Sequence, residues 1–381
     1  MRRLLSNLRN WKKSLRPWHP LITIEIKERA LRHNLDTLKR LAPQWQIAPV
    51  LKSNAYGHGL CAVAGILEHV EHIPFLCVDS YFEAEMIRRE GIRAPLLILG
   101  HSSLEAIERN RWRGASFVVG SLEQLATLAA HGTRQSIHVK FDTGMHRQGI
   151  PFDKLGKALR LMKEGEKKLN VEGILSHFAD ASTPNSTITE TQITRWNIIA
   201  RRIHEELPSI RFYHIANSAG FAHTPDIIAN VGRPGIALYG INPGNLAMEF
   251  EPALRMRSVV SDLRILKKGD TAGYGAAFIA PHAMKIATVP VGYFEGIDRR
   301  LSSRGAFLLN GQVAPLVGYV SMNISLCDVT HAGEVAIGDS VTVISDHPAD
   351  VNSIERIARE CGTIPYETLV RIPAHLRRTV I

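Results

Sequence analysis

The sequence contains few cysteines and no long hydrophobic run. Its 381 residues include only four cysteines, which lie far apart and form no Cys-x-x-Cys pair. Because structural zinc sites and disulfide frameworks use closely spaced cysteines, we predict neither, and no metal site. No stretch reaches the roughly 18 to 20 consecutive apolar residues that a membrane-spanning helix needs. We therefore expect a protein that does not cross a membrane and that works in a reducing compartment, the cytoplasm.

Positive charge is concentrated at the start of the chain. The formal net charge is +10, and six arginines and lysines fall within the first 16 residues. Because much of the excess is local, we predict no nucleic-acid partner. Residues 1–20 form a basic leader that lacks the apolar core of a secretory signal. Leucines and Trp11 fall near helical spacing there, so residues 1–18 form either an amphipathic helix that touches a membrane surface or a partner, or a frayed terminus.

The rest of the chain divides into two patterns, of which the first is α/β. Between residues 21 and 245, β-rich runs alternate with amphipathic helical segments, which indicates βαβ units and a parallel sheet. Eight such runs predict a (β/α)8 TIM barrel. The runs are residues 47–53, 75–80, 95–100, 115–120, 137–143, 173–179, 212–218 and 235–240.

The second pattern, residues 246–381, predicts a mostly antiparallel β-domain. Its β-rich runs follow one another without helices between them, and Asn310-Gly311 stands between two apolar runs. Both residues tolerate the positive φ of a type I′ hairpin turn. One helical segment begins near Ser353 and ends at Gly362, which can take a left-handed C-cap conformation. The chain is thus a leader, a barrel and a β-domain.

Charged and polar residues follow several of the predicted barrel strands. They are Lys52, Arg147, His177, Asn217, Ser218 and Arg233. The carboxyl ends of barrel strands and the loops after them form the active sites of TIM barrels, so we expect these side chains to meet. An amine at the position of Lys52 can form a Schiff base. Each residue also has a structural alternative, such as a hydrogen-bonded core histidine or a surface ion pair.

The last two predicted strands are followed by groups that can bind phosphate. TIM barrels often bind phosphate with these loops, where exposed backbone N–H groups meet the anion. Here the loops supply Ser218 and the amides of Gly235 and Ile236. A Schiff-base lysine after the first strand and a phosphate site after the last two match one phosphorylated aldehyde cofactor. Pyridoxal 5′-phosphate fits this description.

Five segments together resemble the alanine racemase family of fold-type III pyridoxal-phosphate enzymes. They are PVLKSNAYGHG, KFDTGMHRQG, HIANSAG, GRPGIALYG and TAGYGAAF, in the order found in the family. The resemblance covers the chain from about residue 21 to its end and leaves only the leader outside. It implies a cytoplasmic homodimeric isomerase that interconverts L- and D-alanine and supplies D-alanine for the cell wall.

The resemblance also implies a role for each site residue. Lys52 and Tyr274 would be the two catalytic bases, with Tyr274 coming from the partner subunit. His177 and Arg233 would support catalysis, and Arg147 and Met322 would bind substrate. The cofactor would be held by Lys52, Tyr56, Asn217, Ser218, Arg233, Gly235, Ile236 and Tyr366. Lys140 matches a position that some members carbamylate, and an unmodified lysine paired with an acid such as Asp142 is the alternative.

Two departures from the family pattern bear on the substrate. Tyr319 and Asn323 stand where the family usually has an arginine and an aspartate. They leave open a broad-specificity racemase acting on serine, lysine or arginine, whereas the tyrosines that narrow the entry, Tyr274, Tyr293 and Tyr366, favour alanine. A cofactor-binding protein without turnover should lack the β-domain. A fold-type III decarboxylase should carry an acid in place of Arg233.

Overall fold

The computed structural model of the chain describes residues 20–244 and 246–381. The predicted helix in residues 1–18 and its membrane contact lie outside these ranges. The described chain forms two compact units. The larger holds residues 25–255, 344–374 and 378–381, and the smaller holds residues 256–343 and 375–377 with the described residues before Glu25. Residues 344–374 therefore pack with the barrel residues, and the linear division at residue 245 stays a prediction.

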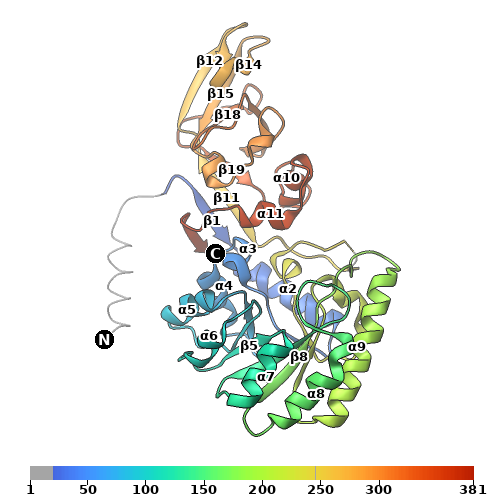
Figure 1. Cartoon of the computed structure of the whole chain (residues 1–381). Coiled ribbons are helices and arrows are strands. Elements are labelled where there is room, and N and C mark those ends of the chain that lie inside the picture. Colours follow the sequence, from blue (N-terminus) through green and yellow to red (C-terminus); the bar gives the residue numbers. More distant parts are fainter. Residues whose placement is uncertain (1–19, 245) are drawn as a thin grey trace. The chain divides into compact units, whose positions relative to one another are not determined.

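Within residues 20–244, eight parallel strands form the predicted barrel of the larger unit (Figure 1). One sheet has the order β3 (Leu76–Val78), β4 (Leu96–Ile98), β5 (Ala115–Val119), β6 (Ser136–Asp142), β8 (Asn170–Leu175), β9 (Phe212–His214). The remaining two strands, β2 (Gln46–Ile47) and β10 (Val231–Gly232), pair with each other in parallel. A bridge between Val50 and Cys77 joins β2 to β3, and the Asn230 amide donates to the Tyr213 carbonyl over 3.1 Å beside β9. These links close the ring.

The predicted eighth strand, residues 235–240, is wrong in position. Ile236–Tyr239 form a short 3-10 helix, η3, and the eighth strand is β10, a few residues earlier. All four residues of η3 are buried. A short apolar run buried on every side has the same sequence pattern in a strand and in a helix, so the pattern could not distinguish them. The first strand is also shorter than the predicted 47–53, because the chain turns at Lys52.

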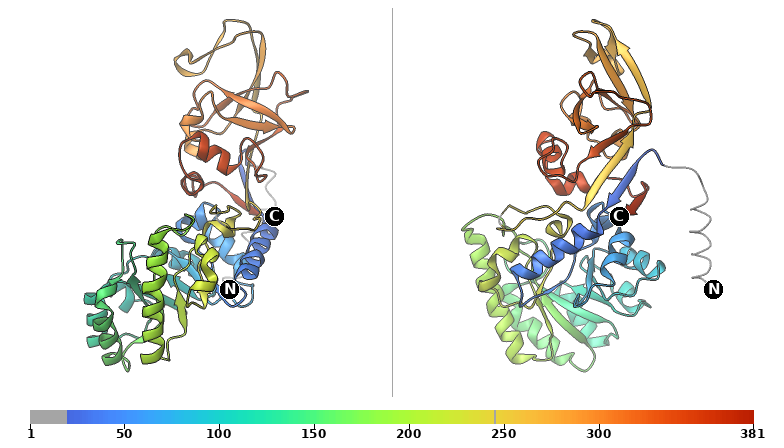
Figure 2. Two further views of the ribbon diagram at one scale, coloured as in Figure 1. Left: turned by 90° about the vertical axis from the view of Figure 1, so that its right-hand side faces the viewer. Right: turned by 180° about the vertical axis from the view of Figure 1, so that it is seen from behind.

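Helices cover the outside of the barrel strands, as Figures 1 and 2 show from several sides. They are α2 (Glu28–Leu41), α4 (Leu60–Leu67), α5 (Tyr81–Arg89), α6 (Leu104–Glu108), α7 (Leu122–His131), α8 (Leu155–Glu164) and α9 (Thr187–Glu206). Short pieces β7 (Ile150–Pro151), η1 (Phe152–Lys154) and η2 (Ala219–Asp226) complete the connections. The side chains of Ser80, Ser103, Ser121 and Ser186 cap α5, α6, α7 and α9. Such caps satisfy backbone N–H groups and determine where these helices begin.

Two short helices from the end of the chain belong to the larger unit. They are α10 (Ile354–Glu360) and α11 (Pro365–Val370). The hydroxyl of Ser353 caps α10, and Gly362 follows it with φ +61°, as predicted. Strands β1 (Thr23–Ile26), β11 (Leu254–Val259) and β20 (Arg378–Val380) lie along the chain where one unit gives way to the other. Among the described residues no helix is long and apolar enough to cross a membrane.

The smaller unit is the predicted antiparallel sheet. Its strand order is β12 (Asp262–Leu266), β15 (Met284–Val289), β18 (Ser325–Asp328), β17 (Gln312–Val317), β16 (Ala306–Leu309), β19 (Ser340–Ile344), and the sheet continues with β11, β1 and β20. A separate pair, β13 (Thr271–Ala272) and β14 (Phe278–Ile279), and the short helices η4 (Tyr274–Ala276), η5 (Tyr293–Glu295) and η6 (Arg299–Leu301) lie in its loops. Asn310 and Gly311 have φ of 52° and 76° between β16 and β17, which confirms the predicted hairpin.

Candidate active site

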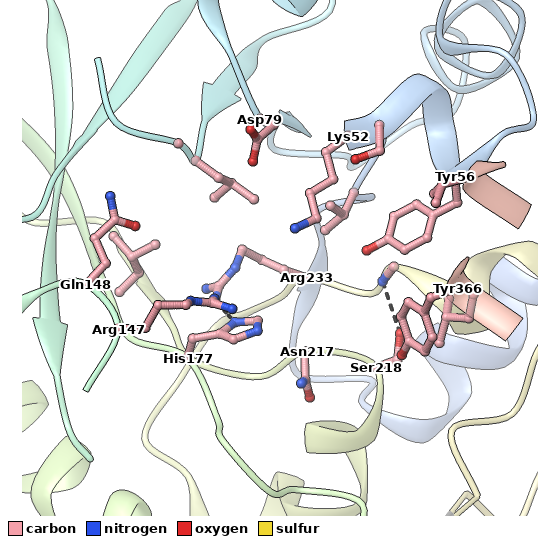
Figure 3. Close-up of a pocket in the computed structure, with 18 of the residues that line it drawn as sticks. Lys52, Tyr56, Asp79, Arg147, Gln148, His177, Asn217, Ser218, Arg233 and Tyr366 are labelled. Carbon is pink, nitrogen blue, oxygen red and sulfur yellow. Dashed lines mark hydrogen bonds between the residues drawn. The ribbon is translucent and has the colours of Figure 1, made fainter. Parts of the chain in front are cut away.

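A cavity of about 700 Å³ lies at the carboxyl ends of the barrel strands and contains the predicted site residues of the larger unit (Figure 3). Its lining includes Lys52, Tyr56, Lys140, Arg147, His177, Asn217, Ser218, Arg233, Gly235, Ile236 and Tyr366. The other two predicted residues, Tyr274 and Met322, belong to the smaller unit. The barrel rule predicted that the residues from Lys52 to Ile236 would meet, whereas Tyr366, which lies in α11, was implied by the resemblance alone.

Lys52 lies at the start of an unusual left-handed turn, α3 (Lys52–Tyr56). The four residues from Ser53 to Tyr56 have φ between 51° and 56°. L-amino acids rarely adopt this conformation in succession, because the side chain crowds the following carbonyl. The turn directs both Lys52 and Tyr56 into the cavity (Figure 3). Sequence reasoning missed it, because Ser-Asn-Ala-Tyr contains no glycine to signal positive φ.

One end of the cavity presents neutral hydrogen-bond donors. The Ser218 Oγ accepts hydrogen bonds from the Gly235 and Ala237 amides at 3.0 and 3.2 Å. Burial, and then the charge of Tyr366, raises the pKa of Tyr56, so its hydroxyl stays protonated. A Cβ atom on Gly235 would lie 2.3 Å from the Tyr56 Oη, so only glycine allows this close approach. Hydroxyl and backbone donors gathered in this way suit a phosphate group.

Arg233 lines the cavity and is almost fully buried. Its guanidinium donates to the carbonyls of Ser176 and His214, each over 2.7 Å, and to the His214 Nδ1 over 2.5 Å. It also lies 3.4 Å from the His177 Nδ1. Burial, followed by the positive charge of Arg233 and Arg147, holds the pKa of His177 well below its usual range. His177 is therefore neutral, and its Nδ1 can accept from Arg233 while its Nε2 carries the proton.

Lys140 and Arg147 also line the cavity. The Lys140 Nζ donates to the Gln148 Oε1 over 3.0 Å, and burial lowers the pKa of Lys140 to about 8, helped by Arg233 and Arg147. The Asp142 Oδ1 accepts from the amides of Gly144, Met145 and His146. Asp142 thus shapes the turn that leads to Arg147, while the hydrogen-bond partner of Lys140 is Gln148. Sequence reasoning did not identify Gln148.

Tyr274 and Met322 lie in exposed loops of the smaller unit, with 75% and 54% of their surfaces accessible. We call residues 273–276, 292–296 and 319–324 the loop cluster. Backbone hydrogen bonds from Tyr293 to Ser321 and from Phe294 to Met322 join two of its segments. Phe294 and Ile324 add further exposed apolar surface. Apolar side chains gathered on a surface in this way typically mark a site of protein interaction.

The two departures from the family pattern both have partners within the smaller unit. The Asn323 Nδ2 donates to the Glu295 Oε1 over 2.7 Å, and the Glu295 Oε2 accepts from the Gly292 amide over 2.8 Å. The Arg299 guanidinium lies 4.7 Å from the centre of the Tyr319 ring. Neither Glu295 nor the stacking of Arg299 was predicted, because both depend on loops that meet only in the folded sheet.

Comparison with known proteins identifies relatives along nearly the whole chain. Residues 26–243 match the family model described as alanine racemase, N-terminal domain, and residues 253–380 match alanine racemase, C-terminal domain. An alanine racemase from Syntrophobacter fumaroxidans is 38% identical over 352 residues, which cover 90% of this chain and 93% of the relative. The solved alanine racemase of Clostridium difficile 630 has a TM-score of 0.87, 30% identity and 96% coverage of both chains. That of Bartonella henselae, solved with covalently bound pyridoxal phosphate, has a TM-score of 0.83 and 25% identity, covering 95% of this chain and all of its own.

Proposed function

The chain belongs to the alanine racemase family, and from this we propose that it is a pyridoxal-phosphate-dependent isomerase that interconverts L- and D-alanine. One observation supports the proposal above all: a single cavity holds Lys52, Arg233 and the phosphate-type donors around Ser218. The four cysteines, all among the described residues, form no disulfide, which suits a reducing cytoplasm. There the enzyme would supply D-alanine for peptidoglycan.

The residues of the cavity fit pyridoxal phosphate. Lys52 would hold its aldehyde carbon and Arg233 would face its ring nitrogen. The phosphate would be bound by Tyr56, Ser218, Gly235, Ile236 and Tyr366, and Asn217 would also contact the cofactor; all six residues line the cavity. When bound, the cofactor withdraws electrons from the substrate and so makes its α-hydrogen acidic. Because Arg233 keeps its own proton in a set of carbonyl hydrogen bonds, it would limit this withdrawal and so disfavour transamination.

Racemisation needs a proton removed from one face of the substrate and returned to the other. The Lys52 amine would serve one face, and Tyr274 of the partner subunit would serve the other. Arg147 would bind the substrate carboxylate, and Met322 of the partner subunit would contact the substrate. The neutral His177, with its proton on Nε2, can donate a hydrogen bond that stabilises an ionised tyrosine oxygen. This role for His177 explains why Arg233 contacts its Nδ1.

The low pKa of Lys140 supports carbamylation at this position. Carbon dioxide adds to the uncharged amine, and a pKa of about 8 makes that form more abundant than in an ordinary lysine. The resulting carboxylate would carry a negative charge beside Arg147 and could orient its guanidinium toward the substrate. Carbon-13 NMR of the native protein equilibrated with ¹³C-bicarbonate should show a carbamate carbon signal that Lys140→Ala lacks, and the absence of this signal from the wild type would contradict the proposal.

A spectrum and a substrate screen test the function directly. Purified protein with pyridoxal phosphate should show a visible absorbance band that is absent in Lys52→Ala and retained in Lys157→Ala, an exposed helix lysine. Loss of optical activity should be fastest with L-alanine among alanine, serine, lysine and arginine. A band without racemisation of any amino acid would contradict the racemase. Faster turnover of serine, lysine or arginine would instead favour the broad-specificity enzyme.

A further inference from the structure

The beginning of the left-handed turn that carries Lys52 and Tyr56 is held by the side chain of Glu83, from the helix α5. The Glu83 Oε1 accepts hydrogen bonds from the Ser53 and Asn54 amides at 2.7 and 3.3 Å. Its other oxygen, Oε2, accepts from the Asp79 amide at 2.8 Å. A single carboxylate therefore joins the loop after β2 to the loop after β3. Glu83 itself is fixed in the first turn of α5, where its amide donates to the Ser80 hydroxyl.

The turn needs such a constraint because its backbone conformation is unfavourable. Four successive residues with positive φ persist only when surrounding contacts over-determine them. The end of the turn is held by Arg378, whose Nη2 donates to the Gly57 carbonyl over 2.8 Å, and by the Asn54 Oδ1, which accepts from the Leu60 amide over 2.9 Å. Glu83 holds the beginning. It binds the two amides that come directly after Lys52.

We propose that Glu83 is a positioning residue for the active site: it fixes the first turn residues so that the Lys52 amine and the Tyr56 hydroxyl face the cavity at a set separation. The inference rests on the proposed function, in which Lys52 holds the cofactor and Tyr56 binds its phosphate. A carboxylate suits the task because it offers two acceptor oxygens to three N–H groups. A glutamine at this position has one acceptor oxygen, so its NH2 group would face either the amides of the turn or the Asp79 amide, and two donors cannot form a hydrogen bond.

Two substitutions at Glu83 and one matched control test the effect on the cofactor and on catalysis. Glu83→Ala removes all three bonds and should weaken pyridoxal-phosphate binding about tenfold or more, with Glu83→Gln intermediate. Because Arg147 is untouched, kcat should fall more than KM for L-alanine rises. Glu85→Ala is the control, since Glu85 lies on the same helix and its carboxylate bonds Arg89. It should stay within about twofold of the wild type in both measurements.

Amide hydrogen exchange of the full chain, with and without pyridoxal phosphate, separates this role from a general loss of stability. In Glu83→Ala, peptides covering residues 52–59 and 78–80 should exchange at least about tenfold faster, while peptides from β5 and β6 keep their wild-type rates. In Glu83→Gln the increase should be smaller, because one acceptor oxygen remains. Unchanged exchange at the turn, or cofactor binding within twofold of the wild type in Glu83→Ala, would overturn the proposal. If wild-type protein neither bound the cofactor nor racemised alanine, the proposed function would fail, while the exchange rates would still report on Glu83.

Discussion

Asn323 shows how one residue can depart from a family pattern for a local reason. Its amide donates a hydrogen bond to Glu295, and Glu295 is buried and also accepts from the Gly292 amide. An aspartate at position 323 would place a second carboxylate at hydrogen-bond distance without a proton to share at neutral pH. We interpret Asn323 as the neutral partner that the buried Glu295 requires. The pair joins two segments of the loop cluster.

Exchanging the two functional groups tests this interpretation. Asn323→Asp should destabilise the protein by about 1–3 kcal/mol at pH 8, because it replaces a hydrogen bond to a charged group with repulsion. The double variant Glu295→Gln/Asn323→Asp should recover most of that loss, since the amide then lies on the other side of the same bond. Urea unfolding of the wild type, the two single variants and the double variant forms the complete cycle. Equal stability of Asn323→Asp and the wild type would contradict the interpretation.

Buried histidines make stability depend on pH, and His58 and His138 lie outside the cavity lining. Burial lowers the pKa of His58 to about 4 and that of His138 to about 3. In the unfolded chain the pKa of both histidines is about 6.5. At a pH between 6.5 and the pKa values of the folded state, the unfolded state therefore binds more protons than the folded state. Stability should therefore fall as the pH decreases below about 6.5, by about 1.4 kcal/mol per pH unit for each histidine.

Urea-unfolding midpoints at pH 7 and pH 5 measure this dependence. His58→Gln removes one titrating group, so the pH dependence of the unfolding free energy should decrease by the equivalent of about one proton. The glutamine amide can still donate to the Ala55 and Tyr56 carbonyls that the His58 ring contacts, so the variant should fold. His72→Gln, at a site with 83% of its side chain exposed, serves as the control and should leave the slope unchanged. A slope in His58→Gln equal to that of the wild type would rule out a contribution from this histidine.

The residues of the cavity could be predicted from the sequence, whereas their supports could not. Lys52, His177 and Arg233 follow barrel strands, and all such positions meet at one end of a closed parallel barrel. Glu83 and Gln148 act through hydrogen bonds to residues that no repeating pattern connects to them. Side chains of these types occur on many solvated surfaces, so their residue type carries no signal before the fold is known.

At the scale of elements, the sequence pattern predicted the order correctly and the boundaries less well. Alternating β-rich and helical runs indicated eight barrel strands, and the serine caps and the Asn310-Gly311 turn act through local chemistry that a sequence displays. The prediction of a strand at residues 235–240 was wrong, because a segment that is buried on all sides shows no periodicity that distinguishes a strand from a helix. The left-handed turn after Lys52 was not predicted, because contacts with Glu83 and Arg378 select its conformation and local sequence preference does not.

The junction between β10 and η3 depends on the absence of a side chain at Gly235. A Cβ atom there would lie 2.3 Å from the Tyr56 Oη and 2.8 Å from its Cζ. Gly235→Ala should displace Tyr56 and with it one end of the proposed phosphate site, so we expect pyridoxal-phosphate affinity to fall by about tenfold or more. Gly156→Ala in α8 is the control, because nothing lies within 4 Å of its Cβ position.

A titration of both glycine variants with pyridoxal phosphate, followed by absorbance, compares them directly. Gly156→Ala should bind like the wild type and be more stable by up to about 1 kcal/mol, since alanine is the better helix former. If Gly235→Ala also bound like the wild type, the close approach of Tyr56 to the backbone would have no part in holding the cofactor.

For the whole molecule, the distribution of the proposed bases links activity to assembly. Lys52 lies in the barrel cavity, while Tyr274 belongs to the smaller unit and is 75% exposed, among the apolar residues of the loop cluster. An exposed tyrosine in a largely apolar patch suits a role in a neighbouring chain. A twofold-symmetric dimer uses the same patch on both subunits, so each chain would complete the site of the other.

Mixing two inactive variants tests the sharing of sites between chains. A dimer of one Lys52→Ala chain and one Tyr274→Phe chain contains one site with both bases intact and one site with neither. Random exchange of equal amounts makes about half of the dimers mixed, so about a quarter of wild-type activity should return. The Lys52→Ala/Tyr274→Phe double variant mixed with either single variant contains no complete site and should stay inactive. No recovery in the first mixture, with subunit exchange confirmed by native mass spectrometry, would place both bases in one chain.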